Sequence, residues 1–402
     1  MRAIRNVPAK HGRLRPSAIG VGVLLVALFL TACSSAGEPT EDEVDPDRLT
    51  KQIDTYLDSL SWDQVRAVSV SAGGETVVEI YRDADPEDYW DVESVTKSVI
   101  SILVGIALDE GHLAGTDQTL AELLPSHAAQ MSLQVAGVTL HQLLTMTAGF
   151  SGMVDDQGAF IDRTPQYMSA NDPVGRILGT ASENPGFDYS NGGGHLVSAI
   201  LREATGMSVL EYARSRLFEP LGISSEPAHE PLGVGVGADE PPNPLWAMPP
   251  AYVKAYLDAG FAWPVDRAGI HLGWGFLKLT PTDLAKIGAL MADQGRWKGK
   301  QVVSEEWVHS STTAQVTVGE DKSAGAGGTG YGYLWWEGTA DADRAYFAAG
   351  YGGQLLVVVP ARDLVVVIAT EYDLTSPSYQ DLSPEQLLPL VDDVITPAFP
   401  NR

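Results

Sequence analysis

The residues with the clearest chemical potential are Ser94 and Lys97, which stand three positions apart at the start of an apolar segment. The segment runs from Asp91 to Gly111 (DVESVTKSVISILVGIALDEG) and is aliphatic on nearly every side, which predicts a helix buried in the centre of a domain. Residues at i and i+3 share a helix face, so the hydroxyl and the amine are expected to be neighbours. A cation in the first turn of a helix is electrostatically unfavourable, so something should compensate for that cost, and a catalytic role is one candidate.

This pair is suited to nucleophilic catalysis. The N-terminus of a helix can supply N–H groups to a developing oxyanion. Burial one turn further along favours the neutral amine of Lys97, which can accept the proton of Ser94. The alternative is structural, with Ser94 capping the helix and Lys97 reaching solvent. An S-x-x-K match is short enough to arise by chance, so the pair alone leaves both interpretations open.

The N-terminal region differs in composition from the rest of the chain. A basic stretch precedes an apolar run from Ala18 to Ala32, which is too short to cross a bilayer as a helix. We therefore expect residues 1–32 to be a secretory signal peptide, with an uncleaved anchor helix as the alternative. Residues 33–48 are acidic and contain prolines, which predicts a flexible tether.

Cys33 directly follows the apolar run, and the ending Leu-Thr-Ala-Cys resembles the bacterial lipobox, in which the cysteine is lipidated. The resemblance implies an exported protein anchored by a lipid on Cys33 at the outer face of the bacterial cell membrane. Cys33 is the only cysteine in the chain, so an intrachain disulfide is excluded, as is a thiol nucleophile elsewhere.

The chain is strongly acidic, with 52 Asp and Glu against 26 Lys and Arg in 402 residues. Such a surface repels phosphate backbones, so nucleic acid is not expected as a partner. The eight histidines show no metal-ligand spacing, and we expect neither a metal nor an organic cofactor. The composition leaves the oligomeric state open.

Apolar spacing predicts strands near both ends of the chain and helices between them. The strands are expected at 67–71, 76–81, 331–336, 344–349, 354–360 and 363–370, and the helices at 49–60, 139–146, 192–206, 209–217, 280–292 and 383–395. This order predicts an α/β protein of the α+β type, with an antiparallel sheet built from both chain ends and flanked by helices.

The main domain is expected to span residues 49–400. It would comprise an α/β lobe, about 49–115 and 270–400, and an inserted helical lobe, about 116–269. Residues 219–275 contain many prolines and glycines, which predicts irregular connection rather than core.

Seven motifs, in this order, resemble those of β-lactamase-related serine hydrolases: ESVTKS (93–98), HQLLTMTAGF (141–150), FDYSNGG (187–193), LFEPLGI (217–223), LTPTDLAKIG (279–288), YGYLWW (331–336) and AAGYGGQ (348–354). That family includes class C β-lactamases, D-alanyl-D-alanine carboxypeptidases, certain esterases and 6-aminohexanoate-dimer hydrolase. The resemblance covers nearly all of residues 50–400. It implies a β-lactamase/transpeptidase-like fold and hydrolysis through a serine acyl-enzyme.

The resemblance also implies roles for individual residues. Ser94 matches the acylated nucleophile, Lys97 the adjacent base and Tyr189 the tyrosine that exchanges protons with nucleophile and leaving group. Asn191 is suited to hydrogen-bond the lysine and a substrate carbonyl. A phenol is a poor base unless a nearby cation lowers its pKa, and Lys97 is expected to supply that cation. Whether Lys97 or Tyr189 takes the first proton stays open.

The third family element departs from the usual pattern. Where β-lactamases have Lys-Thr-Gly, this chain has Ala348-Ala349-Gly350, so the cation and hydroxyl that recognise a substrate carboxylate are absent. Gly350 still allows close backbone approach, and the Tyr351 N–H falls where the family places its second oxyanion-hole donor. We therefore expect an amidase or esterase acting on a small molecule, closest in motifs to 6-aminohexanoate-dimer hydrolase-like members.

Two alternatives remain beside that interpretation. One is a D-alanyl-D-alanine carboxypeptidase or class C-like β-lactamase, and the other is a non-catalytic binding or sensor lipoprotein with the same fold. Residues 150–167 are a candidate flap over the site. His141 and His195 are expected to be structural, and three tryptophans are expected either to line the pocket or to belong to the core: Trp274, Trp335 and Trp336.

Overall fold

A computed structural model describes residues 44–401 except 61–62, 151–166, 168–169, 181–185, 227–249, 320–325 and 373–381. The described residues belong to one compact unit that begins at Val44. The predicted signal peptide, Cys33 and the tether up to residue 43 lie outside the described residues, as does the candidate flap apart from Phe150 and Tyr167. Among the described residues, no helix is long and apolar enough to cross a membrane.

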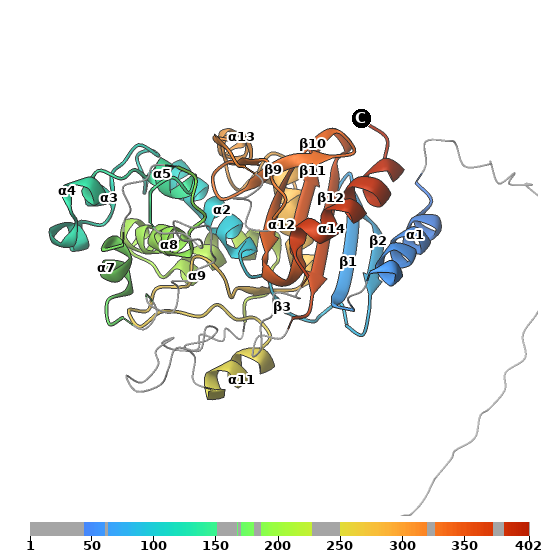
Figure 1. The fold of residues 1–402 in the computed structure, drawn as a ribbon, viewed down its shortest axis with the longest axis horizontal. Coiled ribbons are helices and arrows are strands. Elements are labelled where there is room, and N and C mark those ends of the chain that lie inside the picture. Colours follow the sequence, from blue (N-terminus) through green and yellow to red (C-terminus); the bar gives the residue numbers. More distant parts are fainter. Residues whose placement is uncertain are drawn as a thin grey trace, which may run out of the picture. The chain divides into compact units, whose positions relative to one another are not determined.

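An eight-stranded antiparallel sheet unites the two ends of the chain, in the order β2-β1-β12-β11-β10-β9-β8-β7 (Figure 1). Its pairing between early and late strands is set by β1 and β12, where Val68 lies opposite Ile368 and Val70 opposite Val366. The sheet predicted from both chain ends is therefore confirmed. Its strands are β1 (Val65–Ala72), β2 (Glu75–Tyr81), β7 (Val316–Thr317), β8 (Gly330–Tyr331), β9 (Trp336–Ala340), β10 (Asp343–Gly350), β11 (Gln354–Val359) and β12 (Leu364–Thr370).

Helices cover both faces of the sheet. Figure 1 shows α14 (Pro384–Leu390) in front of the strands and α12 (Pro281–Ala292) behind them. α12 packs directly on β11 and β12. Its Gly288 makes this contact close, since a Cβ there would lie 2.4 Å from Cγ1 of Val365. α1 (Pro46–Ser59) packs on β2 through one apolar stripe, formed by Leu49, Ile53 and Leu57.

α2 (Val95–Asp109) joins the sheet to a group of helices, because it packs on β10 and also on α8 (Asn191–Thr205). Every residue from Val95 to Ala107 is buried, which confirms the predicted central helix. Figure 1 shows the other helices of this group on the side of α2 away from the sheet. They are α3 (Leu120–Leu123), α4 (Leu133–Ala136), α5 (Leu140–Leu144), α7 (Pro173–Leu178) and α9 (Val209–Ala213).

Two expectations about local structure were wrong. Residues 331–336 are not one strand: Tyr331 ends β8, Trp336 begins β9, and residues 332–335 form a turn, in which the Gly332 N–H donates to the Trp335 carbonyl and Leu334 has φ +62°. Residues 219–275 are not merely connection: residues 250–258 form α11, and Phe261, Trp263 and Leu272 are buried core. Prolines exclude long regular elements there, but backbone bonds such as Leu272 N–H to Pro264 O still order the segment.

Short elements complete the described unit. They are β3 (Trp90–Asp91), which pairs with β4 (Lys278–Leu279), the hairpin β5 (Arg296–Trp297) and β6 (Lys300–Gln301), α10 (Glu219–Leu221), α11 (Pro250–Asp258) and α13 (Glu305–Thr312). The β3–β4 pair matters for the site, because β3 ends just before Ser94 and β4 follows the segment that contains Trp274.

Candidate active site

Ser94 occupies the N-cap position of α2, but its hydroxyl caps no backbone N–H. Lys97 Nζ lies 2.9 Å from Ser94 Oγ, and the lysine side chain is only 1% exposed. The predicted contact between the Ser94 hydroxyl and the Lys97 amine is therefore confirmed. The alternative, a capping serine beside a lysine that reaches solvent, does not hold.

The Lys97 amine has two further oxygen partners. Nζ lies 2.9 Å from Asn191 Oδ1 and 2.9 Å from the carbonyl oxygen of Trp274. Both oxygens can only accept, so the amine donates one hydrogen to each. An ammonium donates a third hydrogen toward Ser94 Oγ, whereas a neutral amine turns its lone pair toward the hydroxyl proton. The geometry therefore suits proton transfer from Ser94 to Lys97.

Glycines bring these partners together. A Cβ at Gly194 of α8 would lie 3.2 Å from the Gly273 carbonyl and 3.5 Å from Lys97 Cε, and a Cβ at Gly273 would lie 2.4 Å from the Gly194 carbonyl. α8 and the segment before Trp274 thus close around the lysine stem. At the start of α8, Ser190 Oγ accepts the Gly193 N–H at 3.0 Å, which fixes the turn that presents Asn191.

Tyr189 lies over the same lysine. Its ring is stacked on Trp336 with a centroid distance of 5.6 Å and meets Tyr331 edge-on, while Lys97 Nζ lies 4.8 Å from its centroid. Trp336 therefore positions the tyrosine. Trp335 instead packs edge-on against Tyr346 in the core.

The phenol of Tyr189 is neutral at physiological pH. Burial raises its pKa well above the ordinary value, a hydrogen bond with Ser94 lowers it and the charge of Glu93 raises it further. The expected lowering by Lys97 was therefore wrong, because desolvation of the phenolate dominates the balance. A neutral phenol beside Ser94 is suited to donate a proton.

The end of β10 lies against the residue that precedes Ser94. A Cβ at Gly350 would lie 2.5 Å from the Val92 carbonyl oxygen and 3.1 Å from Glu93 Cβ, so a larger side chain does not fit. Gly350 at the end of β10 is thus brought against the two residues that precede the nucleophile. Within the described part of the chain, no protein acceptor takes the Ser94 N–H.

Three polar residues next to Ser94 were missed by sequence reasoning. Asp91 Oδ1 accepts the Glu93 N–H at 2.8 Å, and the Tyr372 hydroxyl contacts both Asp91 Oδ2, at 3.2 Å, and Glu93 Oε1. Both carboxyls are buried. The acidic residue inside ESVTKS was the only available signal, since Tyr372 lies far away in the sequence and belongs to none of the motifs.

Burial raises the pKa of Asp91 to about 6, although the Glu93 N–H, Tyr256, Lys278 and Tyr372 all act to lower it. The folded protein thus favours the protonated form of this carboxyl. This preference contributes fully to the stability of the fold below the ordinary pKa of 3.8, and the contribution is lost as the pH rises through about 6.

The two candidate histidines interact with other partners. His141 Nδ1 lies 3.1 Å from the Tyr333 hydroxyl, and His195 Nε2 lies 3.0 Å from Asp266 Oδ2 in a fully buried pair. In the segments that the structure describes, no group of three His, Cys, Asp or Glu residues is arranged to hold a metal ion.

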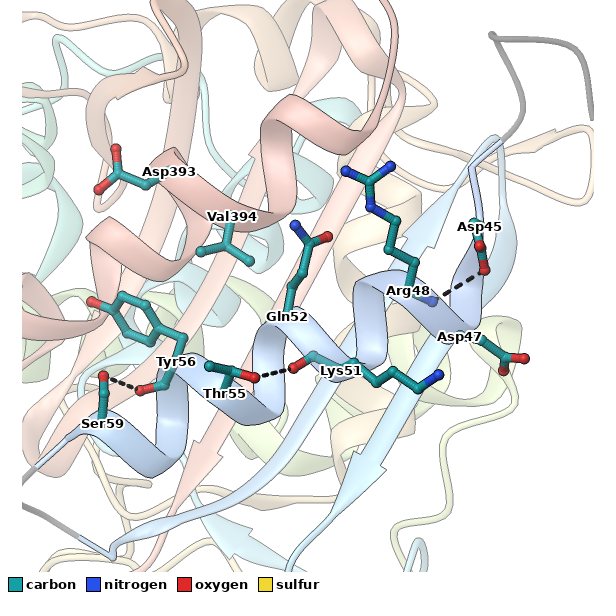
Figure 2. Close-up of a pocket in the computed structure, with 10 residues that line it drawn as sticks. All are labelled: Asp45, Asp47, Arg48, Lys51, Gln52, Thr55, Tyr56, Ser59, Asp393 and Val394. Carbon is teal, nitrogen blue, oxygen red and sulfur yellow. Dashed lines mark hydrogen bonds between the residues drawn. The ribbon is translucent and has the colours of Figure 1, made fainter.

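A separate surface hollow, with a volume of about 880 Å³, lies between α1 and the π-helical segment Val391–Ile395. Figure 2 shows its lining side chains on these two elements, with Tyr56 and Gln52 on α1 and Asp393 and Val394 opposite. None of the residues around Ser94 lines this hollow, so it is not part of the candidate site.

Comparison with known proteins agrees with this geometry. Residues 64–388 match the protein family described as Beta-lactamase. The chain belongs to the beta-lactamase family. This family member is a serine hydrolase, and it is 25% identical over 317 residues to Penicillin-binding protein 4 of Amycolatopsis lactamdurans, covering 73% of this chain and 75% of that protein.

A second relative is named 6-aminohexanoate-dimer hydrolase, from Paenarthrobacter ureafaciens. It is 24% identical over 351 residues, which cover 82% of this chain and 78% of the relative. The crystal structure of a class C beta lactamase from Rhodobacter sphaeroides has a similar fold, with a TM-score of 0.57 and 16% identity over 87% of this chain and 99% of that one. The β-lactamase/transpeptidase-like fold is therefore confirmed.

We predict that Asp91→Asn becomes more stable relative to the parent as the pH rises from 4 to 8, because the parent must then ionise a buried carboxyl. Thermal unfolding at pH 4, 6 and 8 measures this difference. As a control, Asp283→Asn removes a buried carboxylate that lies 2.9 Å from Lys286 Nζ. The stability of this variant relative to the parent should not increase as the pH rises from 4 to 8. Parallel pH profiles for the parent and Asp91→Asn would contradict the assignment.

Proposed function

We propose that this hydrolase cleaves an amide or ester bond through an acyl-enzyme on Ser94. The observation that carries the proposal is the Lys97 amine, 2.9 Å from Ser94 Oγ, whose other two acceptors are fixed oxygens. The neutral amine takes the hydroxyl proton as Oγ attacks the substrate carbonyl. Asn191 and the Trp274 carbonyl hold the amine in line while it is protonated.

Tyr189 completes the proton path. Its neutral phenol, hydrogen-bonded to Ser94, passes a proton to the leaving nitrogen or oxygen and regains one from the Lys97 ammonium. Water then attacks the acyl-enzyme, which releases the acid and restores Ser94. The N–H groups of Ser94 and Tyr351 stabilise the oxyanion in both steps, and each such donor contributes about 10²- to 10³-fold to the rate.

The proposed substrate class follows from the end of β10. Ala348 and Ala349 are both buried and offer neither a cation nor a hydroxyl to a substrate carboxylate. This absence favours general amides and esters over β-lactams and D-alanyl-D-alanine peptides. The relative named Penicillin-binding protein 4 keeps the second class as the alternative.

A fluorescent penicillin and a panel of p-nitrophenyl esters and anilides separate the two substrate classes. We expect turnover of esters or anilides without stable labelling by the penicillin, because β10 lacks the carboxylate-binding cation. Stable penicillin labelling without ester or anilide turnover would favour the carboxypeptidase alternative. No turnover of any substrate would revive the non-catalytic alternative.

We further propose that the protein is exported and anchored through a lipid on Cys33. The proposal is supported by a basic N-terminal stretch followed by an apolar segment that ends in Leu-Thr-Ala-Cys. In a bacterial host, the full chain should fractionate with membranes and incorporate labelled palmitate. Cys33→Ala should lose both properties. Palmitate incorporation that is equal in the parent and the variant would contradict the anchor.

Ser94→Ala should abolish labelling by a fluorophosphonate and reduce kcat by at least about 10³-fold, because the nucleophile is removed. Ser98→Ala provides the matched control on the same buried helix, since Ser98 Oγ donates to the Leu334 carbonyl at 2.7 Å and not to the site. The control should label like the parent. Equal labelling of Ser94→Ala and the parent would make the assignment wrong.

A further inference from the structure

The backbone at Glu93 has an unusual conformation. Its φ is +47°, in the left-handed region that a glutamate rarely adopts. Two carbonyls here accept hydrogen bonds from the first turn of α2: the Val92 carbonyl accepts the Val95 N–H at 3.1 Å, and the Glu93 carbonyl accepts the Thr96 N–H at 2.9 Å. The next peptide therefore presents the Ser94 N–H outside the helical hydrogen bonds, where it can meet an oxyanion.

Neighbouring groups hold this conformation. The Asp91 carboxyl accepts the Glu93 N–H at 2.8 Å, and the Tyr372 hydroxyl ties the two carboxyls together. The Glu93 side chain also lies between two glycine backbones: a Cβ at Gly275 would be 3.2 Å from Glu93 Oε2, and one at Gly350 would be 3.1 Å from Glu93 Cβ. The strained residue is thus fixed from three sides.

The hydrogen-bond count shows why an amide could replace the Asp91 carboxyl. The Tyr372 hydroxyl has one proton and can donate to only one of the two carboxylates. The second contact becomes a hydrogen bond when Asp91 is protonated and donates to the phenol oxygen. The other polar groups near Asp91 are the Tyr256 hydroxyl, which hydrogen-bonds with Asp91 and also lies 3.1 Å from the Phe276 carbonyl oxygen, and the Lys278 ammonium. An asparagine at position 91 reproduces the protonated form.

We propose that Asp91 and Tyr372 are positioning residues that hold Glu93 in its left-handed conformation and thereby direct the Ser94 N–H at the substrate oxyanion. This inference rests on the proposed acyl-enzyme function. Neither side chain touches the reacting atoms in this scheme. Because the oxyanion develops only during the reaction, losing this alignment lowers kcat while leaving KM nearly unchanged.

The test measures kcat and KM for a p-nitrophenyl ester, and the fluorophosphonate labelling rate, at pH 6. Asp91→Ala should lose about 10- to 100-fold in kcat and in labelling rate, with KM within about twofold of the parent. Asp91→Asn should recover most of this loss, because its Oδ1 accepts the Glu93 N–H and its Nδ2 donates to Tyr372. Tyr372→Phe should lose about 3- to 10-fold, because one contact to each carboxyl disappears.

Matched controls separate positioning from general damage. Asp283→Ala removes a buried carboxylate elsewhere, and Tyr346→Phe removes a buried hydroxyl that donates to the Met291 carbonyl at 2.9 Å. Both controls should keep the parent kcat.

Parent-like rates in Asp91→Ala, or equal losses in the Ala and Asn variants, would overturn the positioning role while the labelled parent upholds the proposed function. If Asp91→Ala does not fold, a parent-like rate in Tyr372→Phe overturns it instead. A parent that is not labelled at all overturns the proposed function and this inference with it.

Discussion

The buried amine of Lys97 is the interaction on which the rest of the site depends. Removing an amine from water is costly unless its hydrogens meet acceptors, and here Ser94, Asn191 and the Trp274 carbonyl meet Nζ at 2.9 Å each. These three partners come from α2, the start of α8 and the segment before β4. The close approach at Gly194 and Gly273 is therefore a condition for the chemistry as well as for packing.

The site also depends on the sheet, because the end of β10 must lie beside the residues that precede Ser94. Gly350 ends β10, late in the chain, yet it contacts Val92 and Glu93 just before the nucleophile. Pairing of β1 with β12 joins early and late strands in one sheet and so makes this meeting possible. Gly275 and Gly350 thus approach Glu93 from later parts of the sequence, and Glu93 lies between them with a left-handed backbone conformation.

Much of this arrangement could be predicted from local patterns. The unbroken apolar run after Ser94 predicts a core helix, and its i, i+3 spacing predicts the contact with Lys97. Tyr189 and Asn191 have no such local link to Lys97, and only the resemblance to a family brought them to the site. The turn at 332–335 depends on tertiary contacts such as Leu334 N–H to the Leu144 carbonyl, which strand propensity does not contain.

Other features carry no readable signal in the sequence. The Trp274 contribution comes from a backbone carbonyl, which every residue possesses. The pKa of Tyr189 is governed by burial, which the spacing of Ser94 and Lys97 does not reveal. Asp91 and Tyr372 meet only because the strand ends converge on the N-terminus of α2.

Acylation of Ser94 is tested by trapping the intermediate. The full-length parent is mixed with a p-nitrophenyl ester, quenched in acid within the first turnovers and analysed by intact and peptide mass spectrometry. We expect the mass of one acyl group on the peptide that contains Ser94, and slower formation of this adduct in Lys97→Met. An acyl group on another residue, or adduct formation in Lys97→Met at the parent rate, would contradict the proposed chemistry.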